Sequence, residues 1–126
     1  MKNIKFDKPR KFSLIISDDY IELYGIKIED IHDQDCCEHV YADFSVLENY
    51  RKQLEELEEI SKLEFKKVKG MGFIIFAEKE NDRRVGILIN CYNEQNGYYS
   101  DELKIKAYDG DKILFEFDSE KQDLIY

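Results

Sequence analysis

The segment 31–43, with the sequence IHDQDCCEHVYAD, holds most of the side chains in this chain that could do chemistry. It contains both histidines, His32 and His39, and two of the three cysteines, Cys36 and Cys37. Thiolate and imidazole groups are typical zinc ligands, so a zinc site is one interpretation. The spacing argues against it, because adjacent residues on a strand project to opposite faces and paired zinc ligands are usually roughly two to four residues apart. We therefore expect no metal and no cofactor.

A second interpretation of this segment is nucleophilic catalysis. Cys37 and His39 would share one face of an extended strand, where the imidazole could act as base for the thiol. The flanking acids disfavour a thiolate, and the sequence shows no pattern typical of an oxyanion hole. The simpler interpretation is that Cys36 and Cys37 are small buried hydrophobic residues. We expect a protein that is not an enzyme and keep a thiol-dependent enzyme as the alternative.

A second notable segment is 92–100, with the sequence YNEQNGYYS. Asn96 and Gly97 can supply the positive φ angles of a tight turn. Tyr98 and Tyr99 follow directly, and clustered Tyr and Asn give a large contact area at a low cost in conformational entropy. The segment therefore predicts a turn, a recognition surface, or both.

The elements expected to position these segments are mainly β-strands. β-branched and aromatic residues predict a strand over 11–17 and a hairpin over 20–31 that is broken near Gly25. Later strands are predicted over 71–78, 83–92, 102–108 and 112–117. The dipeptide Asp109-Gly110 between the last two is a strong hairpin signal, so these strands should be antiparallel.

One stretch has a helical period instead. Leu47, Tyr50, Leu54 and Leu57 recur at spacings of three and four residues, and a capping-box pattern begins at Ser45. A single amphipathic helix is therefore expected over about 45–63, with a glutamate-rich outer face. One helix among about six or seven strands predicts an α+β fold in which the helix packs on a curved antiparallel sheet.

Composition narrows the functional classes. The chain has 126 residues, with 19 Lys and Arg against 28 Asp and Glu, which gives a formal net charge of −9. This length, without a linker-like segment, predicts one domain over 1–126. The negative charge disfavours direct nucleic-acid binding, since that depends on Lys and Arg. We also expect no membrane segment and no signal peptide, and the odd number of cysteines favours reduced thiols in the cytoplasm.

The negative charge is concentrated locally. No Lys or Arg occurs between Lys27 and Arg51, a stretch with seven acids, and the predicted helix adds four glutamates at its end. Such a surface could imitate a phosphate backbone and bind a basic protein. The acidic residues expected to contact this partner are Glu29, Asp30, Asp33, Asp35, Asp43, Glu55, Glu56, Glu58 and Glu59.

Two sequence blocks, 33–41 (DQDCCEHVY) and 93–100 (NEQNGYYS), together resemble a family of small phage and bacterial domains of unknown function. Members of that family typically have a Cys-Cys-Glu block after an early hairpin and an Asn-Gly-Tyr-Tyr block in a late strand-loop-strand. The resemblance covers most of residues 20–107, although the helix here is longer and more acidic than is typical of the family. It implies a phage or mobile-element setting in the cytoplasm of a bacterial host cell and a compact, strand-rich domain.

The resemblance also implies that the two blocks meet in space, as either a pocket or a structural clasp. The residues concerned are Cys36, Cys37, Glu38, His39, Asn96, Gly97, Tyr98 and Tyr99. In a clasp, Glu38 would accept hydrogen bonds while the cysteines fill the core. In a pocket, the same residues would bind a small ligand such as a nucleotide signal.

The sequence thus favours a small, acidic, non-enzymatic binding protein that inhibits a host defence component or another basic, nucleic-acid-handling protein. The alternative is a small-ligand binder or a thiol-dependent enzyme whose pocket lies between the Cys-Cys-Glu and Asn-Gly-Tyr-Tyr blocks. Tyrosine-rich strands are also compatible with a homo-oligomer.

Overall fold

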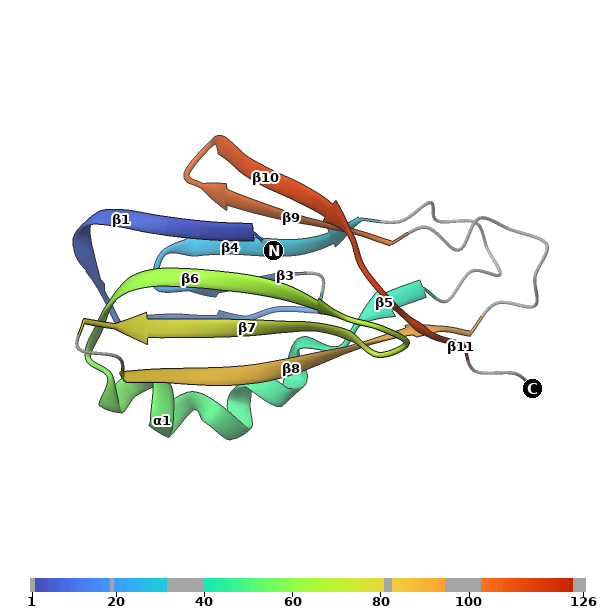
Figure 1. Ribbon diagram of the computed structural model, residues 1–126, viewed down its shortest axis with the longest axis horizontal. Helices are drawn as coiled ribbons and strands as arrows, with labels where there is room; N and C mark the ends of the chain where they lie inside the picture. The colour runs from blue at the N-terminus through green and yellow to red at the C-terminus, as the bar shows by residue number, and fades with distance from the viewer. Residues whose placement is uncertain (1, 19, 32–39, 81–82, 95–102, 124–126) are drawn as a thin grey trace.

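The computed structural model describes residues 2–18, 20–31, 40–80, 83–94 and 103–123, and these ranges form two β-sheets with a helical segment at one side (Figure 1). The six-stranded sheet contains β1 (Lys2–Lys11), β5 (Val40–Ala42), β6 (Glu59–Val68), β7 (Gly72–Lys79), β8 (Arg83–Asn93) and β11 (Gln122–Asp123). The five-stranded sheet contains β2 (Leu14–Ile16), β3 (Tyr20–Leu23), β4 (Ile26–Ile31), β9 (Lys104–Asp109) and β10 (Lys112–Asp118). The 3-10 helix η1 (Phe44–Tyr50) runs directly into α1 (Arg51–Glu56).

Strand order explains how distant segments become neighbours. The six-stranded sheet has the order β1-β6-β7-β8-β11, and β5 also pairs with β8. The five-stranded sheet has the order β10-β9-β4-β3-β2. The described pairs are antiparallel except β11 with β8. The prediction of a mainly antiparallel α+β fold with one helix is confirmed in outline, but the strands are more numerous than expected and form two sheets instead of one.

Most predicted strands are found close to their expected positions. The hairpin broken near Gly25 is β3 and β4, where Tyr24 (φ 52°) and Gly25 (φ 80°) form the two-residue turn between Leu23 and Ile26. Two successive positive φ angles are those of a type I′ turn, whose twist matches that of the flanking strands. The last predicted pair, β9 and β10, forms the expected hairpin around Gly110 (φ 61°).

The prediction of a helix over about 45–63 was wrong at its C-terminal end. The helix stops at Glu56, and β6 begins at Glu59. Glu58 has φ 64°, the left-handed conformation that ends many helices and that is usually adopted by Gly. Beyond it, Ile60 and Leu63 are buried in a strand that pairs with β1 on one side and β7 on the other. Hydrogen bonding on both edges therefore outweighs the helical spacing of these apolar residues.

Strand β1 has no counterpart among the sequence predictions. Its sequence KNIKFDKPRK lacks apolar alternation, and its register with β6 shifts between Lys5 and Arg10. Lysines, a proline and a bulge are the features that protect an exposed sheet edge from unwanted pairing, and β1 is an edge strand of the six-stranded sheet. At its end, Arg10 Nη2 lies 2.6 Å from Asp109 Oδ2 of β9, an ion pair that joins the two sheets.

The core lies between the two sheets. Ile75 and Ile87 of the six-stranded sheet and Ile28 and Ile105 of the five-stranded sheet have no exposed surface. An aromatic cluster fills one region, in which the Phe65 and Phe115 rings meet edge to face with centroids 5.1 Å apart. Apolar side chains from both sheets thus supply the burial that stabilises the fold.

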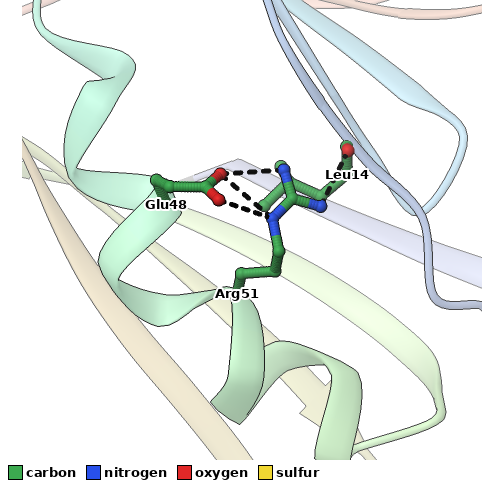
Figure 2. Close-up of polar contacts among 3 residues, drawn as sticks. All are labelled: Leu14, Glu48 and Arg51. Carbon is green, nitrogen blue, oxygen red and sulfur yellow. Dashed lines mark hydrogen bonds and ion pairs between the residues drawn. The ribbon is translucent and has the colours of Figure 1, made fainter.

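The helical segment is fixed to the five-stranded sheet by polar contacts. Arg51 Nη1 donates a hydrogen bond of 3.2 Å to the Leu14 carbonyl of β2, and its Nη2 lies 2.8 Å from Glu48 Oε2 (Figure 2). The buried Tyr24 hydroxyl donates a 2.6 Å hydrogen bond to the Leu54 carbonyl, and burial raises the pKa of this tyrosine. Because β2 is an edge strand, Arg51 thereby supplies a hydrogen-bond partner to one carbonyl of that strand.

Candidate partner-binding surface

The two sequence blocks lie mostly outside the described residues. Asp33, Asp35, Cys36, Cys37, Glu38 and His39 belong to segment 32–39, and Asn96, Gly97, Tyr98 and Tyr99 belong to segment 95–102. The proposed choice between a pocket and a clasp therefore stays a prediction. What the structure describes is how the strands on either side of each segment are arranged.

The strands that flank the two segments are paired with each other. Segment 32–39 connects β4 to β5, and segment 95–102 connects β8 to β9. β4 pairs with β9, so that Ile31 lies opposite Lys104. β5 pairs with β8, so that Val40 lies opposite Asn93. The described strand ends that flank the two segments therefore lie at the same end of the molecule (Figure 1).

A tyrosine pair marks the described part of this end. Tyr41 of β5 lies opposite Tyr92 of β8, and their ring centroids are 5.5 Å apart. The Tyr41 hydroxyl donates a 3.1 Å hydrogen bond to Glu94 Oε1. Partial burial and this carboxylate together raise the pKa of Tyr41 to about 12. Tyr41 therefore stays neutral at physiological pH and acts as a hydrogen-bond donor.

The net charge is divided unevenly between the strands and the two connecting segments. The described ranges contain all 19 Lys and Arg but only 21 of the 28 acids, so their formal net charge is −2. Segment 32–39 holds three acids, segment 95–102 holds two, and neither contains Lys or Arg. Five of the nine excess negative charges therefore belong to segments whose ends are brought together by strand pairing.

Three of the predicted partner-binding acids bind groups within the chain. Glu29 accepts a 2.6 Å hydrogen bond from the Tyr108 hydroxyl, and Asp30 Oδ2 accepts one of 2.9 Å from the Ala42 amide. Asp43 is the N-cap of η1 and accepts hydrogen bonds from the Ser45 amide and hydroxyl. These carboxylates therefore have structural roles in the fold.

Four other predicted partner-binding acids, Glu55, Glu56, Glu58 and Glu59, lie at or just beyond the C-terminal end of α1, and we call them the helix-end acids. Glu55, Glu56 and Glu58 are exposed, and none of the three, nor Glu59, takes part in an ion pair among the described residues. The last turn of α1 holds no basic residue, so the carboxylates lie next to the negative end of the helix dipole. A cation supplied by another molecule would relieve this unfavourable arrangement.

The described residues bear on two interpretations of the sequence, a metal site and a reactive thiol. They contain no group of three or more His, Cys, Asp or Glu that could hold a metal ion. Cys91, the described cysteine, is buried, and burial raises the pKa of its thiol to about 11. Ser119 donates a hydrogen bond to its sulfur, 3.4 Å away. This thiol is therefore protonated and inaccessible under physiological conditions.

Comparison with known proteins places the chain in a family. Residues 9–105 match a family described as a domain of unknown function, DUF7448. The chain belongs to this family. The DUF7448 match runs from within β1 to within β9 and includes both connecting segments, but it leaves out β10 and β11. No curated protein and no solved structure matches the chain.

The DUF7448 match confirms the expectation of a small domain of unknown function, without indicating a phage origin or the two motifs. The described helices include none that is long and apolar enough to cross a membrane. Sequence reasoning overlooked the outer face of the six-stranded sheet, where Ile74, Phe76 and Leu88 lie. Its signal is the uninterrupted apolar run of β7, because a strand with one solvated face usually alternates apolar and polar residues.

Proposed function

We propose that this protein is a non-enzymatic, acidic binding protein that attaches to and inhibits a basic, nucleic-acid-handling protein. A component of a bacterial defence system is the partner class we favour. This assignment to a phage or mobile-element setting rests on the family resemblance described above. The observation that carries the binding proposal is the separation of charge between a nearly neutral strand framework and two acidic segments.

Electrostatics supports this proposal physically. Segments 32–39 and 95–102 contribute five acids and no Lys or Arg, and their flanking strands are hydrogen-bonded neighbours. Concentrated charge of one sign accelerates encounter with an oppositely charged protein and selects against acidic partners. Asp33 and Asp35 are the acids of segment 32–39 that we assign to partner binding.

The helix-end acids are a second part of the proposed surface. Glu55, Glu56, Glu58 and Glu59 have no ion-pair partner in the described ranges and lie at the negative end of α1. A lysine or arginine side chain of the partner would neutralise both the carboxylates and the helix dipole. Reversal of these four charges should therefore weaken binding, and unchanged binding would remove the helix end from the surface.

The experiment is affinity capture from bacterial lysate at low and high salt, followed by mass spectrometry and then by measurement of Kd with the purified partner. The variant D33N/D35N should raise Kd by about tenfold at low salt. D7N/D111N is the matched control, because it removes two exposed acids elsewhere. Equal effects of the two variants, or capture insensitive to salt, would contradict the proposal.

The paired flanks also favour a second candidate function, a small-ligand site between the Cys-Cys-Glu and Asn-Gly-Tyr-Tyr blocks. A nucleotide signal is the ligand class considered, although the absence of Lys and Arg from both segments counts against an anionic ligand. The variants Cys37→Ser and Glu38→Gln test it. Full retention of ligand binding or turnover by folded variants would exclude this site.

A further inference from the structure

Strand β7 is apolar on both of its faces. Phe73, Ile75 and Ala77 point into the core and have no exposed surface. Ile74 and Phe76 lie between them on the opposite face and are half-buried. A continuous apolar strand is typical of a sheet that is covered on both sides, whereas a solvated face usually carries polar residues. The sequence of β7 thus predicts a second covering layer.

None of the described elements supplies that layer. In Figure 1, β6, β7 and β8 lie in front of β3 and β4, and no helix or strand crosses their central residues. Leu88 of β8 pairs with Ile74, and Gly86 pairs with Phe76, so the apolar side chains form one patch across two strands. We call Ile74, Phe76 and Leu88 the outer apolar patch.

Two neighbouring features define the shape of the patch. A Cβ atom at Gly86 would lie 2.8 Å from Phe76 Cε1, so the phenyl ring lies over the glycine. The guanidinium of Arg84 lies 4.3 Å from the centroid of the same ring, a cation–π contact. Phe76 is therefore held flat against the sheet, and the patch is a preformed surface.

Charges of opposite sign border the patch on β6. Glu64 lies opposite Phe76, and Lys66 lies opposite Ile74. Lys66 is exposed, whereas the Glu64 side chain is 12% exposed and its carboxylate lies 2.5 Å from Lys62 Nζ of the same strand. The paired residues form two rows that run across β6, β7 and β8. One row contains Glu64, Phe76 and Gly86, and the neighbouring row contains Lys66, Ile74 and Leu88.

We propose that a second copy of this chain covers the outer apolar patch in a face-to-face, two-fold symmetric dimer. The axis would lie in the plane of the interface, perpendicular to the strands and midway between the two rows. Each row then faces the other row of the second copy. Lys66 meets Glu64, Ile74 meets Phe76, and Leu88 packs over the shallow position at Gly86, each contact occurring twice.

Charge complementarity selects this axis over the alternative. A third row across the sheet contains Lys62, Glu78 and Arg84. A two-fold axis parallel to the strands would place each row over the same row of the second copy. Lys62 of one copy would then face Arg84 of the other. Like charges in apposition are destabilising. The perpendicular axis avoids this and pairs opposite charges, as an isologous interface requires.

Sedimentation equilibrium of the purified full chain tests the proposal. The wild-type protein should show a reversible monomer–dimer equilibrium. K66E and E64K should each raise the dimer Kd about tenfold, because each places like charges in both symmetric contacts. The double variant E64K/K66E should restore Kd to within about threefold of the wild-type value, since the opposite charges meet again. Because Glu64 also pairs with Lys62 within the chain, the unfolding temperature of each variant separates the loss of that ion pair from the loss of the dimer contact.

Controls separate the interface from general effects on charge and folding. K106E changes the same charge on the other sheet and should leave Kd unaltered. L88S should shift the protein to monomer, whereas I113S, at a site that is 56% exposed on β10, should not. Circular dichroism and thermal unfolding confirm that each variant is folded. A monomeric wild-type protein up to about 1 mM, binding of the patch only to an unrelated protein, or a dimer insensitive to K66E and L88S would overturn the proposal.

Discussion

The outer faces of the two sheets differ in how their side chains are satisfied. On the five-stranded sheet, polar groups from neighbouring strands bind one another. Lys27 Nζ lies 3.6 Å from Glu29 Oε2 and 4.8 Å from the centroid of the Tyr20 ring. The Tyr108 hydroxyl donates a 2.6 Å hydrogen bond to Glu29. This face is therefore stabilised by the chain itself and is suited to contact with water.

The six-stranded sheet has a different outer face. Its centre is the half-buried outer apolar patch of Ile74, Phe76 and Leu88, with the Arg84 guanidinium over the Phe76 ring. The removal of apolar surface from water lowers the free energy, so association through this face is favourable. The central strands of the five-stranded sheet thus complete their polar interactions within the chain, while its exposed apolar side chains, Ile15 and Ile113, lie on its edge strands. On the six-stranded sheet the apolar side chains gather on the central strands instead.

The largest expected effect separates the inner and outer faces of β7. Ile75→Ala should lower the free energy of unfolding by about 3 kcal/mol, because it creates a cavity between the sheets. Ile74→Ala should lower it by less than about 1 kcal/mol when the protein is dilute enough to be monomeric. Urea denaturation at low protein concentration measures both values. Equal losses would show that the outer patch is already packed within the monomer.

A smaller effect is expected for the polar network of the five-stranded sheet. Tyr108→Phe removes the hydroxyl that donates to Glu29 and should cost about 1 kcal/mol of stability. The variant should leave the dimer Kd unchanged, since Tyr108 lies on the other sheet. Thermal unfolding and sedimentation equilibrium provide the two measurements, and a change in Kd would break the assignment of the interface to the six-stranded sheet.

The same network predicts a dependence on pH. The hydrogen bond to Glu29, together with partial burial, raises the pKa of Tyr108 to about 12, and Glu29→Gln should return the pKa toward 10. Because the pKa is higher in the folded state, this contribution to stability is complete below pH 10 and is lost as the pH rises toward 12. Tyrosine titration followed by NMR gives the site-specific value. An unchanged Tyr108 pKa in the variant would contradict the assigned contact.

The smallest effect is expected at the ion pair between Lys106 and Glu116. Their charged groups are 3.6 Å apart, and their side chains are 26% and 47% exposed. Lys106→Ala should therefore change the free energy of unfolding by less than about 0.5 kcal/mol, and high salt should remove the difference. Thermal unfolding at two salt concentrations is the measurement. A larger loss would show that ion pairs contribute more to the stability of this face than inferred here.

Local patterns in the sequence predicted much of the fold. Asp109-Gly110 and Gly25 identified two hairpins, because glycine permits positive φ angles at tight turns. The helix was predicted too long because Leu57, Ile60 and Leu63 fit a helical spacing as well as they fit the irregular start of β6. What ends the helix is the left-handed conformation of Glu58, and a glutamate gives no sequence signal for it.

The candidate sites could be predicted only in part. The local lack of Lys and Arg was visible in the sequence, but the structural roles of Glu29, Asp30 and Asp43 depend on partners elsewhere in the chain. The Tyr108 that binds Glu29 is 79 positions away. The outer apolar patch likewise requires the register of β7 with β8, which determines that Ile74 and Leu88 are neighbours.

Concentration-dependent NMR of the amide-labelled protein tests the difference between the two faces most directly. As the protein is concentrated, amide shifts of Ile74, Phe76, Leu88 and Lys66 should move together along one binding curve. The amides of Lys27, Glu29 and Lys106 should keep their shifts. Movement on the five-stranded sheet, or no movement on either sheet, would contradict the conclusion that the six-stranded face is completed by a second copy.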